Sequence, residues 1–141
     1  MRTFSLAGST ALVTGSSQGI GLAIAQGLYA AGARVVFHGK AEPAPAMPPG
    51  SIYLVEDLLA SEGPARLVTA AFKARPEIDL LVCNAGSFFD VPFLEMGPEQ
   101  FDRTLNLNVR ANYFVAQTFA RALVAAKRPG AIVTTCSTNS F

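Results

Sequence analysis

The chain has 141 residues and a formal net charge of +1; half of its residues are apolar and 15% are charged. That length suits one domain, residues 1–141, and the apolar share is typical of strands buried on both faces. No run of Lys or Arg exceeds two residues, which excludes a basic nucleic-acid surface. No apolar run approaches the roughly 18 residues of a membrane span, and the start lacks a secretory signal pattern. We expect a soluble, cytoplasmic protein.

Few residues of this sequence are suited to bind a metal. The two cysteines, Cys83 and Cys136, each lie near the end of an apolar run, so we expect two buried, reduced thiols. There is no Cys-x-x-Cys pair, and the single histidine, His38, has no ligand-like neighbours in the sequence. The sequence therefore predicts no metal site.

Short apolar runs alternate with helical periodicity along the whole chain, which indicates βαβ units. Strands are predicted at Thr10–Val13, Val35–Phe37, Ile52–Val55, Ile78–Val82 and Ala131–Thr135. Helices are predicted from Ile20 to an end at Gly32, from a cap at Ser61 to Arg75, and from Gly97 to about Lys127, the last as two helices meeting near Asn106. The pattern predicts an α/β fold with a Rossmann-like, doubly wound parallel sheet.

One connection is unusual for such a fold. The segment Lys40–Ser51, between the second and third strands, contains Pro43, Pro45, Pro48 and Pro49. This proline density excludes a helix, so we expect an extended, polyproline-like loop. A parallel pairing is normally crossed by about a dozen residues that include a helix. We therefore expect part of one face of the sheet to be uncovered.

The strongest functional signal is the glycine-rich segment Thr14-Gly15-Ser16-Ser17-Gln18-Gly19-Ile20-Gly21, between the first strand and its helix. Gly15 permits the tight turn, Gly19 lets the backbone approach a pyrophosphate, and Gly21 permits close packing of helix on strand. The free N–H groups and the helix dipole then face the phosphates. The alternative is an ordinary glycine-rich turn, but the strand–turn–helix context favours dinucleotide binding. A P-loop is excluded because its Lys-Ser/Thr pair is missing.

The spacing TGxxxGIG resembles the short-chain dehydrogenase/reductase family, and further motifs in the same order extend the resemblance over the chain. Asn84-Ala85-Gly86 is similar to the family's NAG motif, which steadies the sheet and lines the adenine side of the cofactor. Asp57-Leu58 is similar to its acidic turn beside the adenine. The resemblance implies a strand order of 3-2-1-4-5. Taken singly, Asn84 could be a turn residue and Asp57 a solvated acid.

Two later motifs of the family carry its chemistry. Asn106-Leu107-Asn108-Val109 resembles the segment whose second asparagine, here Asn108, belongs to the catalytic tetrad and holds a water. Ile132–Ser137 resembles the fifth strand that ends at the catalytic serine, here Ser137. Taken singly, Asn108 could be a buried polar residue and Ser137 a strand cap. The resemblance implies an NAD(P)-dependent oxidoreductase acting on an alcohol or carbonyl compound.

Cofactor choice depends on the end of the second strand. In the family an Asp there accepts hydrogen bonds from the ribose 2′-OH, whereas a nearby basic residue attracts a 2′-phosphate. Here Gly39 occupies the acidic position and Lys40 follows it. We expect NADP to be preferred, with NAD possible. The alternative is that Lys40 is a solvated surface lysine.

The family's Tyr-x-x-x-Lys motif, downstream of the serine, is not in this sequence. The chain ends four residues after Ser137, and none of Tyr29, Tyr53 and Tyr113 has a lysine four residues on. Three interpretations follow: the cofactor-binding part of an enzyme completed by a C-terminal half, a non-catalytic dinucleotide-binding module, or a truncated product that misfolds alone. The segment Ser87–Phe93 predicts an aromatic substrate wall or, alternatively, core packing.

The predicted long helix also bears on assembly. Its segment Val109–Ala120 is apolar almost all round, so one face can cover the sheet and another can contact a partner. In the family the equivalent helix packs against its copy in a second subunit. We therefore expect a homodimer or homotetramer.

Overall fold

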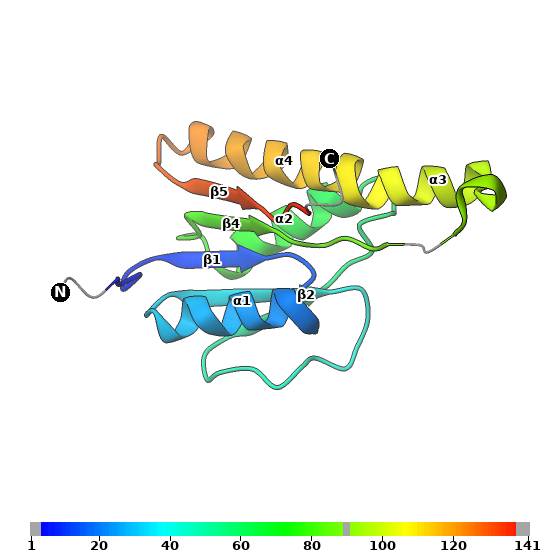
Figure 1. The fold of residues 1–141 in the computed structure, drawn as a ribbon. Helices are drawn as coiled ribbons and strands as arrows, with labels where there is room; N and C mark the ends of the chain where they lie inside the picture. The colour runs from blue at the N-terminus through cyan, green and yellow to red at the C-terminus, as the bar shows by residue number, and fades with distance from the viewer. Residues whose placement is uncertain (1–3, 89–90, 138–141) are drawn as a thin grey trace.

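The computed structural model describes residues 4–88 and 91–137, and it contains one parallel sheet (Figure 1). The strands are β1 (Thr10–Val13), β2 (Arg34–Gly39), β3 (Ile52–Val55), β4 (Leu80–Cys83) and β5 (Ala131–Thr134). They are ordered β3-β2-β1-β4-β5, and every neighbouring pair is parallel. This confirms the predicted α/β, Rossmann-like sheet and its 3-2-1-4-5 order.

Helices cover both faces of the sheet. They are α1 (Gly19–Ala30), α2 (Gly63–Ala74), α3 (Pro98–Leu105) and α4 (Asn112–Ala125), with a short 3-10 turn, η1 (Phe93–Glu95), before α3. A π-helical segment, η2 (Asn106–Ala111), joins α3 to α4, so the predicted junction near Asn106 is confirmed. Figure 1 shows α1 on one side of the sheet and α2 and α4 on the other. No described helix is long and apolar enough to cross a membrane.

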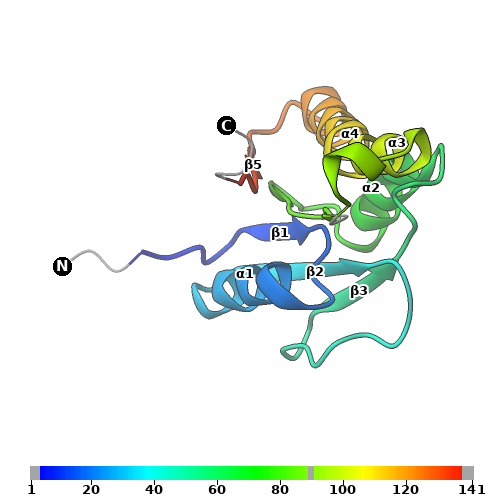
Figure 2. The ribbon, with the colours of Figure 1, turned by 45° about the vertical axis from the view of Figure 1, so that its right-hand side comes forward.

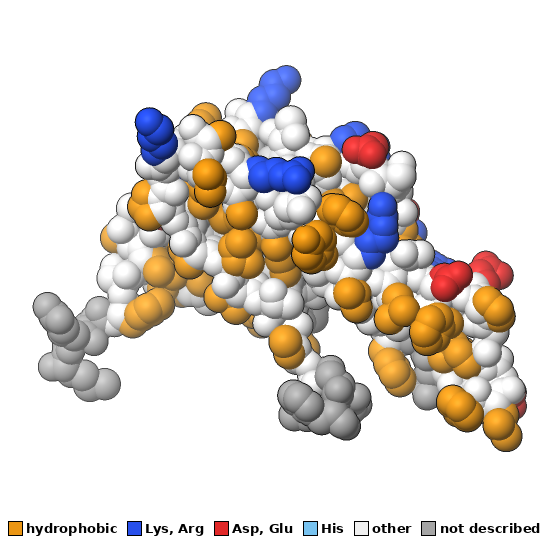
Figure 3. Space-filling view, turned by 90° about the horizontal axis from the view of Figure 1, so that it is seen from above, with side chains coloured by type: hydrophobic (Ala, Val, Ile, Leu, Met, Phe, Trp, Pro, Cys, Tyr) orange, Lys and Arg blue, Asp and Glu red, His pale blue; other side chains and the backbone are white. Residues whose placement is uncertain are grey.

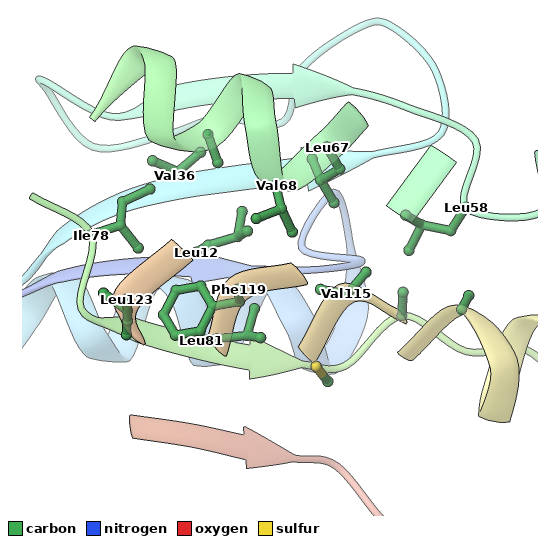
Figure 4. Close-up of a cluster of buried hydrophobic side chains, with 14 residues drawn as sticks. Leu12, Val36, Leu58, Leu67, Val68, Ile78, Leu81, Val115, Phe119 and Leu123 are labelled. Atoms are coloured by element: carbon green, nitrogen blue, oxygen red, sulfur yellow. The ribbon is translucent and has the colours of Figure 1, made fainter. Parts of the chain in front are cut away.

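The core consists of two hydrophobic layers because successive side chains of a strand point to opposite faces. On one face, Leu12, Val36 and Leu81 pack against α2 and against Phe119 of α4 (Figure 4). On the other face, residues of the same strands pack against Ala25 of α1; they are Val13, Val35, Phe37 and Val82. Strands buried on both sides explain the high apolar fraction of the sequence.

The predicted end of α1 and the predicted start of α2 have different outcomes in the structure. Gly32 has a φ of +99°, and its N–H donates to Tyr29 O at 2.8 Å while the next N–H donates to Leu28 O. This left-handed cap confirms the predicted end of α1. The cap predicted at Ser61 is wrong, because α2 begins at Gly63 and no side chain caps it. Pro64 in its first turn, already fixed in helical φ, favours the start there.

The fourth strand starts later than predicted, at Leu80. Ile78 is fully buried, but its N–H donates to Arg75 O in the turn that closes α2. Asp79 then accepts the Thr10 N–H at 2.8 Å through its carboxylate. An apolar run that includes a buried turn residue cannot be distinguished from a strand by hydrophobicity alone.

The connection between β2 and β3 contains no helix, as the prolines predicted, and Figure 2 shows it as an open loop. Met47 of this loop packs against the hydrophobic layer on the α1 side. The face that we expected to be partly uncovered therefore receives at least one apolar side chain from the loop.

The sheet is unevenly covered at its β5 edge. All four residues of β5 are exposed, including Ile132 at 42% and Val133 at 59%. Cys136, just beyond this strand, is exposed, so the expectation of two buried thiols is correct only for Cys83. Burial raises the pKa of the Cys83 thiol to about 11, which keeps it protonated at neutral pH.

Candidate functional site

A cavity of about 510 Å³ lies at the carboxyl ends of β1, β2, β3 and β4; we call it the carboxyl-edge cavity. Ligands of open α/β sheets bind at this edge, near the point where the strand order reverses. The cavity walls come from the glycine-rich turn, from the segments after β2, β3 and β4, and from the α3–η2 junction. Its lining residues are Gly15, Ser17, Gln18, Gly19, Ile20, Gly21, His38, Gly39, Lys40, Glu56, Asp57, Leu58, Leu59, Asn84, Ala85, Gly86, Ser87, Arg103 and Leu107.

The three glycines of the turn meet three different requirements. Gly15 has a φ of +63°, and a Cβ there would lie 2.8 Å from the Ala85 Cα. A Cβ on Gly21 would overlap the Gly15 carbonyl oxygen and the Asn84 side-chain amide. Gly19 has a φ of +56°, yet no atom lies within 4 Å of its Cβ position. Two of these glycines allow close packing inside the protein, whereas Gly19 leaves open space beside the cavity.

The N-terminus of α1 provides donors at this cavity. No side chain caps the helix, and its first turn contains no acidic residue. The first N–H groups of a helix have no intrahelical acceptor, and the helix dipole gives this end a partial positive charge. Ile20 in this turn is 70% exposed. The arrangement suits the oxygens of a phosphate group.

Thr14 connects the glycine-rich turn to the segment after β4. Its fully buried hydroxyl accepts the N–H groups of Asn84 and Ala85, both at 3.0 Å. Asn84 returns two hydrogen bonds from Nδ2, to the carbonyls of Thr14 at 3.3 Å and Gly15 at 3.2 Å. Asn84 therefore steadies the turn, and Gly86 lies in the cavity wall beyond it. The role of Thr14 was not predicted from the sequence, although this residue opens the motif.

His38 is a second connection that the sequence analysis missed. Its ring is 2% exposed; Nδ1 accepts the Gly15 N–H and Nε2 donates to Glu56 O, both at 3.0 Å. These two bonds require the neutral tautomer that carries its proton on Nε2. Burial lowers the pKa of His38, which also favours the neutral form. Across the described residues, no group of three His, Cys, Asp or Glu side chains could hold a metal ion.

The two serines of the turn are placed differently. Ser16 is fully buried and does not line the cavity. Its Oγ donates to Val13 O at 2.7 Å and accepts the His38 N–H at 2.9 Å, and its own N–H donates to His38 O. Ser17 lines the cavity, as do Gln18 and Ile20. The structure thus brings Ser17, rather than Ser16, to the predicted phosphate position.

Lys40 and Asp57 form an ion pair at the adjacent wall, with Nζ and Oδ2 3.3 Å apart. The other carboxylate oxygen of Asp57 accepts the Leu59 N–H at 2.9 Å. That hydrogen bond, with Lys40 and Arg103 nearby, holds the pKa of the Asp57 carboxyl below its ordinary value. Leu58 is 4% exposed and belongs to the core, although it also reaches the cavity. Lys40 thus lines the cavity as one partner of an exposed ion pair.

Asn108 lies in the π-helical segment η2 and binds the loop after β4. Its Oδ1 accepts the Ser87 N–H and its Nδ2 donates to Ser87 O, both at 2.8 Å. Asn112, one turn later, donates to Ala85 O and to Asn108 O at 3.0 Å. The π-helical segment and the first residue of α4 thus each bring an asparagine side chain to the segment that borders the cavity.

Ser137, the last residue described before 138–141, follows β5 at the same edge of the sheet. Thr135 connects this segment to β4: its N–H donates to Cys83 O at 2.9 Å and its Oγ1 to Asn84 Oδ1 at 3.3 Å. Ser137 is exposed and does not line the carboxyl-edge cavity. The structure therefore places Ser137, the predicted catalytic serine, at the same edge of the sheet as the carboxyl-edge cavity but outside its lining.

The two described aromatic rings of the segment after β4 are exposed. Phe88 is 79% exposed and Phe93 is 91% exposed, so these two rings do not pack in the core; Phe89 and Asp90 lie outside the described residues. Arg103 and Leu107 also line the cavity, which the sequence did not predict. Both lie in the long helical region, far along the chain from the glycine-rich turn, and only the fold brings them to the same cavity.

The sequence and the fold both match known proteins. The family model for short chain dehydrogenases matches residues 9–141. L-xylulose reductase of Homo sapiens is 38% identical over 132 residues, covering 94% of this chain and 54% of that protein. Gluconate 5-dehydrogenase of Gluconobacter oxydans is 37% identical over 145 residues, covering 97% of this chain and 56% of that protein.

A solved structure extends the likeness to the backbone. A 3-oxoacyl (acyl-carrier-protein) reductase of Agrobacterium tumefaciens with NADP bound has a TM-score of 0.83 and 31% identity, covering 99% of this chain and 56% of that one. The chain thus spans slightly more than half the length of the relatives it matches. The match to the family model over nearly all of its residues establishes that the chain belongs to the short-chain dehydrogenase family.

Proposed function

We propose that residues 1–141 form a single dinucleotide-binding domain of an oxidoreductase that prefers NADP and interconverts an alcohol and a carbonyl compound. The observation that carries this is the carboxyl-edge cavity, where an uncapped helix N-terminus meets the open space at Gly19. Both features suit the close approach of a pyrophosphate. A structural relative from Agrobacterium tumefaciens contains NADP, which agrees with this choice of cofactor.

Different lining residues of the cavity would contact different parts of the cofactor. The N–H groups of Gly19, Ile20 and Gly21 would bind the pyrophosphate, beside Gly15, Ser17 and Gln18. The ionised Asp57 carboxylate, whose pKa is lowered, would accept a hydrogen bond from the adenine amino group. Leu58 and the Asn84-Ala85-Gly86 segment would border the adenosine.

Lys40 would bind the 2′-phosphate that distinguishes NADP from NAD. Its partner in the structure is Asp57, but both side chains are well exposed, at 65% and 41%. Exposed ion pairs contribute only about 0–1 kcal/mol. A phosphate bearing about two negative charges can therefore compete with Asp57 for the Lys40 ammonium.

At the other end of the cavity, the nicotinamide of a bound cofactor would accept or supply a hydride. Ser137 would donate a hydrogen bond to the substrate oxygen and stabilise charge developing there. Asn108 holds the Ser87 backbone, and by family resemblance it would help to hold a water on the proton path. The general acid, a tyrosine in the family, would have to come from outside this sequence.

Calorimetric titration of the 141-residue chain with NADP+ and NAD+ tests the proposal. We expect tighter binding of NADP+, and Lys40→Ala should weaken it by roughly tenfold to a hundredfold, the value of one charge-assisted hydrogen bond. NAD+ affinity should change little. Lys73→Ala, which removes a lysine of α2 outside the cavity lining, is the matched control. Equal affinities for the two cofactors in the unsubstituted chain would contradict the NADP preference.

Turnover is tested separately. We expect no activity from the 141-residue chain alone, since it supplies no tyrosine acid. Supplying a C-terminal half from the family should restore NADPH oxidation with a carbonyl substrate, for which L-xylulose is a suitable first probe. In that complemented protein, Ser137→Ala should remove most activity. Robust turnover by the chain alone would refute this assignment of roles.

We also propose that a second copy of the chain packs on α4. Val109, Tyr113 and Phe114 are exposed on this helical region at 61%, 61% and 37%, and Arg110 lies 4.9 Å above the Phe114 ring. Figure 3 views the molecule from the side of α3 and α4 and shows hydrophobic side chains gathered there. Light scattering should detect a dimer or tetramer, whereas a stable monomer at micromolar concentration would count against it.

A further inference from the structure

Gly39, at the end of β2, lies beside the ring of Tyr53 from β3. A Cβ on Gly39 would overlap the Tyr53 hydroxyl and would lie 2.9 Å from both the Tyr53 Cζ and the Ser17 Cβ. Gly39 does not have a positive φ, so the backbone conformation does not require a glycine here. The Tyr53 side chain, which makes the shortest contact, and the Ser17 Cβ exclude a side chain at position 39; the path of the chain does not.

Tyr53 is held in this place by several contacts. Its hydroxyl donates to Ala41 O at 2.7 Å. Its ring packs against the hydrophobic layer that contains Phe37, its cross-strand neighbour in the register of β2 and β3. Burial and the Glu42 charge raise the pKa of Tyr53, so the phenol is neutral near pH 7. Moving the ring would break these contacts.

Hydrogen bonds fix the backbone on both sides of Lys40, and the one on its far side comes from Tyr53. Before it, Gly39 O accepts the Glu56 N–H at 3.0 Å; after it, Ala41 O accepts the Tyr53 hydroxyl. Gly39 and Lys40 both line the carboxyl-edge cavity. Tyr53 therefore has two effects: it helps to position Lys40, and it keeps position 39 free of a side chain. Both effects determine the charge that would face the 2′-substituent of the ribose.

We propose that Tyr53 is a specificity-determining residue for the cofactor, which acts by barring a carboxylate from the end of β2 and by positioning Lys40. A carboxylate at that place in dinucleotide-binding folds accepts the ribose 2′-OH and repels a 2′-phosphate. The inference rests on the proposed function, because it concerns which form of the dinucleotide the cavity accepts. It predicts that position 39 cannot be changed to favour NAD unless Tyr53 is changed with it.

Four proteins test this: the unsubstituted chain, Gly39→Asp, Tyr53→Val and the double variant. Unfolding midpoints and the Kd values of NADP+ and NAD+ are measured for each. Gly39→Asp alone should lower the midpoint and weaken both cofactors at least tenfold, because the new side chain meets Tyr53. Tyr53→Val alone should weaken NADP+ severalfold and keep its preference. The double variant should recover most of the midpoint and shift the preference toward NAD+ by about tenfold to a hundredfold.

Two control variants show whether adding a carboxylate, or removing a tyrosine, has an effect anywhere in the chain apart from the contact between positions 39 and 53. Gly27→Asp adds the same carboxylate in α1 where no atom lies within 4 Å of the Cβ position, and Tyr29→Val removes an exposed tyrosine of the same helix. Neither should change the ratio of the two Kd values.

The possible failures are distinguishable. If Gly39→Asp shifts the Kd ratio toward NAD+ by the same factor with and without Tyr53→Val, or if the unfolding effects of the two substitutions add independently, the role of Tyr53 is overturned. Both results leave NADP+ binding by the unsubstituted chain in place. Binding of neither cofactor by that chain would instead overturn the proposed function.

Discussion

Two regions at the carboxyl edge of the sheet differ in how deeply their polar side chains are buried. Around β1, Thr14 and His38 are almost fully buried, and each joins the glycine-rich turn to another segment through hydrogen bonds of 3.0 Å. After β5, Thr135 and Ser137 are exposed, and Thr135 contributes one side-chain bond of 3.3 Å. The region of the glycine-rich turn, proposed to bind the cofactor, is therefore pre-organised by buried hydrogen bonds, whereas the region proposed for chemistry is exposed to solvent.

The difference shows which part of the site this chain can position by itself. Buried hydrogen bonds are costly to break because their groups lose solvent on folding, so the geometry of the glycine-rich turn is strongly determined. An exposed strand end can exchange its bonds with water. We expect the first region to tolerate little change and the second to tolerate much.

The largest difference in stability should come from replacing a threonine by valine in each of the two regions. Thr14→Val keeps the side-chain volume but leaves the Asn84 and Ala85 N–H groups without their acceptor, at a cost of about 2–4 kcal/mol. Thr135→Val, at the exposed position, should change stability by less than about 0.5 kcal/mol. Urea unfolding of both variants measures the difference. Equal losses would show that the two regions are bonded equally well.

A smaller difference in stability is expected between two glycine-to-alanine substitutions within α1, one of them beside the glycine-rich turn. Gly21→Ala places a Cβ against the Gly15 carbonyl and the Asn84 amide, which should cost about 1–3 kcal/mol by overpacking and weaken NADP+ binding. Gly27→Ala, where no atom lies within 4 Å of the Cβ, should instead stabilise the helix by about 0.5–1 kcal/mol. Thermal unfolding and NADP+ titration test both. A tolerated Gly21→Ala would contradict the close packing of α1.

The smallest effect should be a pH dependence that comes from His38. Burial lowers its pKa below the ordinary 6.5, so below about pH 6.5 the unfolded chain binds a proton that the folded chain does not. Stability therefore rises with pH in the window between the folded pKa and 6.5, and falls as the pH drops through it. Protonation of Nδ1 would also remove the acceptor of the Gly15 N–H.

His38→Gln is the control, because glutamine does not titrate and its amide can still donate toward Glu56 O. Stability measured by urea unfolding between pH 7.5 and 5.5 should decline more steeply in the unsubstituted chain than in this variant. The neighbouring Glu56 and Asp57 have pKa values lowered from 4.5 and 3.8, so they titrate below this window. Parallel curves for the two proteins would exclude His38 as the origin of the dependence.

Local sequence patterns predicted the sheet because the features that define it are local. Apolar runs, the glycine-rich turn and the prolines before β3 each act on their own segment. The structure confirms the five strands, the close packing at Gly15 and Gly21, and a connection without a helix between β2 and β3. Errors arose where a buried turn residue continued an apolar run, at Ile78, and where a helix began without a side-chain cap, at Gly63. In both places local chemistry is compatible with either outcome, and packing selects one.

The sequence by itself determined the glycine-rich turn, the order of its motifs and the absence of a carboxylate at Gly39. Only the tertiary structure decided that His38 binds the turn and that Tyr53 fills the space at Gly39. The physical reason is that parallel strands bring residues from separate segments to one edge of a sheet. The partners of a side chain there come from the register between strands, which no pattern within a single segment specifies.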